Sequence, residues 1–153
     1  MILSMKTLIS IFLIFLFFNA ASSSDNFSQS IAALVESENL TPDYSLTIFQ
    51  RCAASYLTTA STASTRSDTK VFAENLKDVA SFFAYLAFQF AQDNPELKKI
   101  SIEENNLVID KLYDDYLIGL ELSKSKSGQY SDGMLQEDLR VCKGIYDASI
   151  SKE

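Results

Sequence analysis

The 153-residue chain contains no histidine and no tryptophan, and it has only four glycines, two prolines and two cysteines. The lack of histidine removes the commonest general base and the commonest neutral metal ligand. It also excludes the haem-attachment motif Cys-x-x-Cys-His and the Glu-x-x-His pairs of di-iron helical bundles. Four glycines leave no glycine-rich loop that could hold a phosphate group. We therefore expect no enzymatic activity, no metal and no cofactor.

Carboxylate pairs are the remaining candidates for chemistry, because two acids one turn apart can hold a hard cation or share a proton. The pairs are Glu103–Glu104, Asp110–Asp114 and Asp114–Asp115. On a helix most of these acids lie opposite the apolar stripe that contains Ile109 and Leu112. We interpret them as a solvated face.

The first residues have the pattern of an export signal. Lys6 is followed by the apolar run TLISIFLIFLFF at residues 7–18 and by small residues at 20–24, where a signal peptidase could cut. Twelve apolar residues are fewer than the ~20 that span a bilayer, so an uncleaved anchor is disfavoured. We expect residues 1–23 to be a cleaved signal peptide and residues 24–153 to form one domain, exported to a periplasm or secreted.

The net charge of −7 makes this an acidic protein. Such a chain repels phosphate backbones, and its lysines and arginines are scattered, so nucleic acid is not expected as a partner. No stable membrane insertion is expected once the signal is removed. A protein partner or a homodimer is possible.

All-helical structure is expected because no segment alternates apolar and polar residues at period two. Thr41-Pro42, the Ser101–Glu104 capping box and Asp132 mark helix starts, while Asn94-Pro95 marks a stop. We expect an antiparallel up-down-up-down four-helix bundle with a short extra N-terminal helix. The short helix covers residues 25–39, and the long helices run over about 42–60, 71–93, 102–122 and 132–153. Asn105 or Asn106 interrupts the apolar face of the third long helix and would need a hydrogen-bonding partner.

The two cysteines are predicted to form a disulfide. An even cysteine count favours a bridge in an oxidising compartment. In the predicted topology the first and fourth long helices are antiparallel neighbours. Cys52 and Cys142 lie near the middle of these helices, at matching heights.

The aromatic-rich segment 71–90 (VFAENLKDVASFFAYLAFQF) is the most apolar part of the expected domain. Its spacing predicts a core stripe along one side of a helix. That stripe comprises Phe72, Leu76, Val79, Phe83, Leu86 and Phe90. Phe82, Tyr85 and Phe88 project away from the stripe, so the N-terminal helix, a partner protein or an apolar ligand could cover them.

These observations favour a small exported helical-bundle protein without enzymatic activity that acts through protein contact. The alternative is a carrier or sensor domain that binds a small apolar ligand in an aromatic-lined bundle core. Phe82, Tyr85 and Phe88 are the candidate partner or ligand surface.

Overall fold

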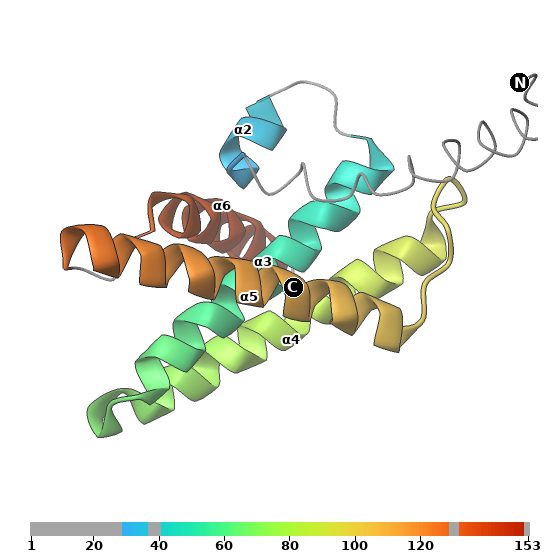
Figure 1. Ribbon diagram of the computed structural model, residues 1–153. Coiled ribbons are helices and arrows are strands. Elements are labelled where there is room, and N and C mark those ends of the chain that lie inside the picture. Colours follow the sequence, from blue (N-terminus) through green and yellow to red (C-terminus); the bar gives the residue numbers. More distant parts are fainter. Residues whose placement is uncertain (1–28, 37–40, 129–131, 152–153) are drawn as a thin grey trace, which may run out of the picture.

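The computed structural model describes residues 29–36, 41–128 and 132–151, and the regular elements within these ranges are helices (Figure 1). They are α2 (Ile31–Glu36), α3 (Pro42–Ser64), the 3-10 turn η2 (Ser67–Thr69), α4 (Lys70–Asp93), α5 (Ile102–Ser127) and α6 (Gly133–Ile150). The prediction of an all-helical bundle of four long helices with a short N-terminal helix is confirmed. The expected signal peptide at residues 1–23 lies outside the described residues.

The helix ends follow the capping signals in the sequence. Thr41 accepts a hydrogen bond from the first turn of α3, and Asp132 accepts one from the first turn of α6. Ser101 and Glu104 form both bonds of the capping box, at 3.1 Å and 2.8 Å. Gly128 ends α5 with a left-handed φ of 74°, a conformation that glycine adopts without strain.

Helix α3 is longer than predicted, because its polar run continues the helix to Ser64 instead of forming a loop. The hydroxyl groups of Thr58, Thr59 and Thr62 each donate to the carbonyl oxygen four residues earlier, at 2.8–2.9 Å. These bonds satisfy the hydroxyl groups within the helix, so even the fully buried Thr58 has a partner. Helix α5 likewise extends beyond its predicted end, to Ser127.

Helix α3 is the centre of the bundle and contacts α4, α5 and α6. Figure 1 shows α3 and α4 side by side as an antiparallel pair, with α5 crossing in front of them. Helix α2 packs against α6 and α3.

The face that α4 turns to the core differs from the predicted stripe. Only Leu76 and Phe83 of that stripe are buried, and Phe72 is 54% exposed, so its assignment to the core was wrong. The buried residues of α4 are Ala73, Leu76, Ala80, Phe83, Ala87 and Ala91. Their face is rotated from the predicted one by roughly 65°, at about 100° per residue. Alanines allow α3 to approach closely, and the larger Val79 and Leu86 remain half-buried at the edge of this contact.

Asn105 joins three helices from a buried position on α5. Its Oδ1 accepts from Gln50 Nε2 of α3 at 3.0 Å, and its Nδ2 donates to the Ala84 carbonyl of α4 at 3.0 Å. The prediction that an amide at this position needs hydrogen-bonding partners is therefore confirmed. Ile102, which the pattern placed inward on the same helix, is 55% exposed because it occupies the first turn.

Candidate functional site: a buried ionic cluster beside the disulfide

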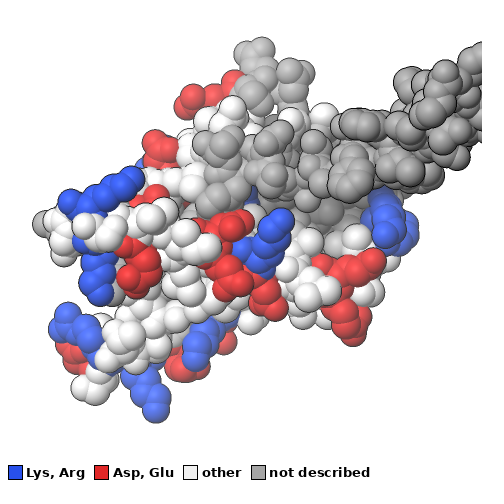
Figure 2. Space-filling model, viewed as in Figure 1, with Lys and Arg blue, Asp and Glu red and all other residues white. Residues whose placement is uncertain are grey.

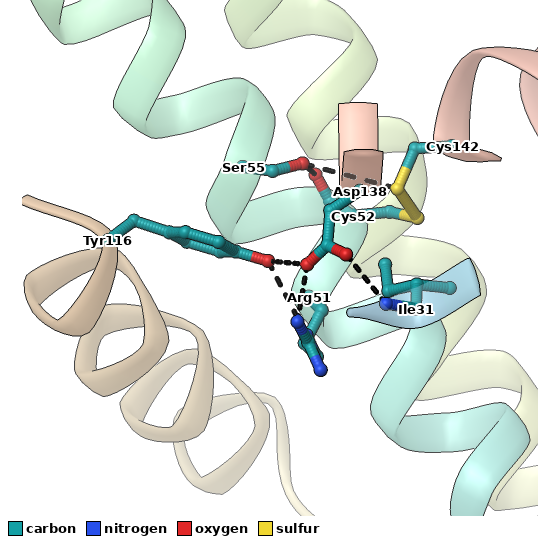
Figure 3. Close-up of a disulfide and its surroundings, with 7 residues drawn as sticks. All are labelled: Ile31, Arg51, Cys52, Ser55, Tyr116, Asp138 and Cys142. Carbon is teal, nitrogen blue, oxygen red and sulfur yellow. Dashed lines mark hydrogen bonds and ion pairs between the residues drawn. A yellow bond between two sulfur atoms is a disulfide. The ribbon is translucent and has the colours of Figure 1, made fainter. Parts of the chain in front are cut away.

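Arg51, Tyr116 and Asp138 form a buried ionic cluster in which three helices meet (Figure 3). Arg51 lies on α3, Tyr116 on α5 and Asp138 on α6. All three residues are 0% exposed. The two buried charged residues of the described ranges thus lie at one point of the bundle.

The three side chains contact one another directly. Arg51 Nη2 donates to Asp138 Oδ2 at 2.5 Å, and the Tyr116 hydroxyl donates to the same carboxylate oxygen. Arg51 Nε approaches the Tyr116 hydroxyl oxygen at 3.4 Å and donates to it. Charge-assisted hydrogen bonds of this kind compensate part of the cost of removing both charges from water.

The cluster also holds the N-terminal end of α2. The backbone N–H of Ile31 donates to Asp138 Oδ1 at 2.6 Å, and Arg51 Nη1 donates to the carbonyl oxygen of Gln29 at 2.6 Å. Ile31 is fully buried and Leu34 nearly so. Asp138 and Arg51 therefore bind the backbone of α2 while its apolar side chains pack on the core.

Burial raises the pKa of Tyr116 well above the ordinary value of 10.0. The positive charge of Arg51 opposes this rise, whereas the negative charge of Asp138 adds to it. The Tyr116 hydroxyl consequently stays protonated and remains a donor to Asp138 at any physiological pH.

The predicted disulfide is present next to the cluster. Cys52 follows Arg51 directly on α3, and Cys142 lies one turn after Asp138 on α6. Their Cα atoms are 5.4 Å apart, and the bond spans 90 residues of sequence. Ser55 Oγ lies 4.0 Å from Cys142 Sγ and donates to the Cys52 carbonyl oxygen at 2.9 Å. One covalent link and one ion pair thus join the same two helices, within a turn of each other.

The cluster's geometry is suited to structural support. Its residues have no exposed surface in this conformation, so a substrate cannot reach them. In the described part of the chain, no three Cys, Asp or Glu residues are placed to hold a metal ion. The acids of α5 at positions 103, 104, 110 and 114 are exposed, in agreement with the predicted solvated face, whereas Asp115 is half-buried.

Phe82, Tyr85 and Phe88 differ in their exposure and surroundings. The Phe82 ring packs edge-on against Phe83 and Tyr146, with centroid distances of 5.4 Å and 5.3 Å. Phe88 is half-buried, and Tyr85 is 65% exposed. Of the three predicted residues, Tyr85 presents the most accessible ring.

Two shallow grooves lie along α3 at the surface. The larger, of about 380 Å³, also contacts α4 and α5, and the smaller, of about 220 Å³, contacts α5. The larger groove is lined by Leu57, Ser61, Ser64, Lys77, Asp110 and Tyr113. Four of these six residues carry polar or charged side chains and one is aromatic, so the groove differs from the aromatic-lined core site considered for an apolar ligand.

Sequence reasoning missed the ionic cluster. Neither Arg51 nor Asp138 is among the residues that the sequence pattern singles out, although a signal for both was present. Arg51 precedes one disulfide cysteine, and Asp138 lies four positions before the other. Because the disulfide joins the two cysteines, it also brings the two opposite charges beside them together.

None of the helices in the described ranges combines the length and the hydropathy that a membrane span requires. Comparison of the chain with protein-family models, with curated proteins and with solved structures finds no match.

Proposed function

We propose that this chain is a small exported helical-bundle protein without enzymatic activity, and that it acts through protein contact in a periplasm or outside the cell. The observation that carries the proposal is the exposure of large apolar side chains on the outer faces of α4 and α5. Tyr85 is 65% exposed, Leu107 68% and Ile118 58%. Leu107 and Ile118 share one face of α5, and exposed apolar residues that share a face are typical of interaction surfaces.

The buried charges also favour a binding role over catalysis. The groups that could carry out acid–base chemistry in the interior, Tyr116 and Asp138, are already bonded to Arg51 and to α2. A bundle stabilised in this way offers a rigid scaffold for surface contacts. Figure 2 shows that acidic, basic and uncharged side chains are interspersed on the face that carries α5, without a large patch of one sign. Such a surface suits a protein better than a nucleic acid.

Export is supported by the apolar run at residues 7–18 and by the disulfide, which persists in oxidising compartments. Mass spectrometry of the protein isolated from its native compartment tests this part of the proposal. The expected N-terminus lies between positions 21 and 25. A mature protein that retains residues 1–18 would contradict cleavage.

The carrier alternative has less support. The aromatic rings that would line its cavity pack against one another, with Tyr56 stacked on Phe83 at 5.9 Å and Phe90 edge-on to Phe49 at 5.5 Å. These contacts occupy the core region that the ligand would need.

Site-specific photo-crosslinking in the producing cells tests the contact function. A photoreactive amino acid at position 85 or 118 should give covalent protein adducts, because these side chains project into solvent. The matched control is position 143, where the lysine side chain is 69% exposed but lies on α6, outside the apolar faces of α4 and α5. Adducts at 85 or 118 but not at 143 are expected, and their absence from both test positions would overturn the proposal.

A further inference from the structure

The outer face of α5 carries two apolar residues that flank two opposite charges. Leu107, Lys111, Asp114 and Ile118 follow one another at spacings of four, three and four. At about 100° per residue they fall within roughly 60° of one another around the helix. All four are exposed. We call these four residues the α5 outer face.

The two charges on this face are available for an external partner. Lys111 and Asp114 take part in none of the ion pairs of the described residues. Their four-three-four spacing is that of a helix–helix contact seam. In the view of Figure 1, α5 crosses in front of α3 and α4, and no other described helix covers the side of α5 that faces the viewer.

We propose that the partner of this face is a second copy of the same chain, bound through an antiparallel pairing of the two α5 helices. The order apolar, positive, negative, apolar is complementary to its own reverse. When Leu107 faces Ile118 of the second copy, Lys111 faces Asp114 of the second copy. The two-fold axis then passes between the levels of residues 112 and 113, and each contact occurs twice.

The charges determine the direction of pairing. In a parallel arrangement in register, Lys111 would face Lys111 of the second copy and Asp114 would face its own equivalent, and both contacts are repulsive. The antiparallel arrangement converts both into attractive pairs. Opposite charges at such positions specify orientation more than they add affinity.

The ends of the seam are compatible with this register. Glu104 would approach Glu121 of the second copy, a pair of like charges at the rim. Lys98 Nζ already lies 3.6 Å from Glu104 and supplies a positive charge there. Val108 and Leu122, which are 42% and 53% exposed, lie beside the seam and add apolar surface at its edges.

This inference deepens the proposed contact function, on which it rests, by naming the partner. Sedimentation of the mature protein over a range of concentrations is the first test, and reversible dimerisation is expected. Lys111→Glu or Asp114→Lys alone should raise the dissociation constant about tenfold, because each creates two like-charge contacts. The double variant Lys111→Glu/Asp114→Lys restores both attractive pairs and should regain the affinity of the unmodified protein.

The matched control reverses a charge elsewhere on the surface. Lys77→Glu on α4 changes the net charge as Lys111→Glu does, but it should leave dimerisation unchanged. A strictly monomeric protein, or a double variant as weak as the two single ones, would overturn the proposal. Far-ultraviolet circular dichroism distinguishes these outcomes from misfolding, since all substituted positions are exposed.

Cysteine cross-linking tests the direction of the helices. The native cysteines are bonded to each other, so introduced thiols can be followed separately. A mixture of Leu107→Cys and Ile118→Cys proteins should oxidise to a mixed dimer. Leu107→Cys alone should not, because the two copies of position 107 would be about 16 Å apart along the antiparallel axis, at 1.5 Å per residue. Cross-linking of Leu107→Cys to itself, without the mixed dimer, would indicate a parallel pairing and refute the antiparallel one.

Failure of this inference and failure of the contact function give different results. If photo-adducts at position 118 have the mass of two copies of this chain, both stand. If adducts form only with a different protein, the contact function stands and self-pairing is wrong. If no adduct forms at 85 or 118, the contact function itself is wrong.

Discussion

Arg51 and Asp138 form an ion pair of 2.5 Å at a position where neither side chain is exposed to solvent. Removing two charges from water costs several kcal/mol per ion, and the attraction between them repays this only when further hydrogen bonds complete the site. Here Tyr116, the Ile31 N–H and the Gln29 carbonyl oxygen supply those bonds. The pair therefore couples α3 and α6 to α5 and α2.

Breaking the pair from one side should be strongly destabilising. Asp138→Asn keeps the shape of the side chain but leaves the Arg51 charge buried without a counter-ion, so we expect a loss of about 3–5 kcal/mol in the free energy of unfolding. The double variant Arg51→Met/Asp138→Leu removes both charges and should lose less stability than Asp138→Asn does. Urea denaturation measures both effects.

The control for these two variants is an exposed ion pair. Lys77 and Glu74 lie 3.0 Å apart with side chains 48% and 58% exposed. Lys77→Met should change stability by less than about 0.5 kcal/mol. If Asp138→Asn behaves like this control, the buried pair does not contribute to stability as argued.

Tyr116→Phe should have an effect that depends on pH. Near neutral pH the loss of a buried hydroxyl that donates to a carboxylate should cost about 1–2 kcal/mol. Because burial raises the folded-state pKa of Tyr116, the unfolded chain releases its proton first as the pH increases. The stability contributed by Tyr116 is thus complete below pH ~10 and decreases by about 1.4 kcal/mol per pH unit above it.

The stability difference between the unmodified protein and Tyr116→Phe should accordingly shrink between about pH 10 and 11. Unfolding curves at a series of pH values provide the measurement. A difference that stays constant across this range would show that Tyr116 titrates normally in the folded protein.

The disulfide should supply a large part of the stability. It closes a loop of 90 residues, for which the chain-entropy model gives about 4–5 kcal/mol as an upper value. Cys52→Ala/Cys142→Ala and the reduced protein should both unfold at much lower urea concentrations than the oxidised protein. Maleimide should label neither cysteine in the oxidised protein, and labelling without prior reduction would contradict the bridge.

The sequence was sufficient to predict the all-helical fold, most helix starts and the disulfide, because each depends on local or compositional signals. Thr41, Ser101 and Asp132 act within their own first turns, so their roles can be recognised from neighbouring residues. Cys52 and Cys142 could be paired because they are the chain's two cysteines. The signal peptide and its cleavage remain predictions.

The ionic cluster and the true core face of α4 could not be obtained in the same way. Whether Arg51 is solvated or buried depends on which helices cover α3, and α2 is one of them. The position of the α4 core face depends on the small size of Ala73, Ala80 and Ala87, which allow close approach to α3. A pattern that emphasises large apolar residues selects the neighbouring phenylalanines instead.

Two phenylalanines of α4 distinguish the predicted face from the observed one. Phe83 is fully buried, so Phe83→Ala should cost about 3–5 kcal/mol. Phe72 is mostly exposed, and Phe72→Ala should cost less than about 1 kcal/mol. Urea denaturation of both variants is the measurement. Equal losses would mean that the predicted stripe, with Phe72 in the core, is correct.

Close packing between α3 and α4 predicts that enlarging an interfacial alanine is harmful even though the new residue favours helix. Ala80 is 1% exposed at this contact, so Ala80→Leu should force the helices apart or the side chain off its preferred rotamer, at a cost of about 1–3 kcal/mol. Asn75→Leu, on the exposed side of the same helix, adds a similar apolar group without a neighbour to displace and should not destabilise. If thermal unfolding shows Ala80→Leu to be as stable as Asn75→Leu, the small side chain is not what sets the approach of the two helices.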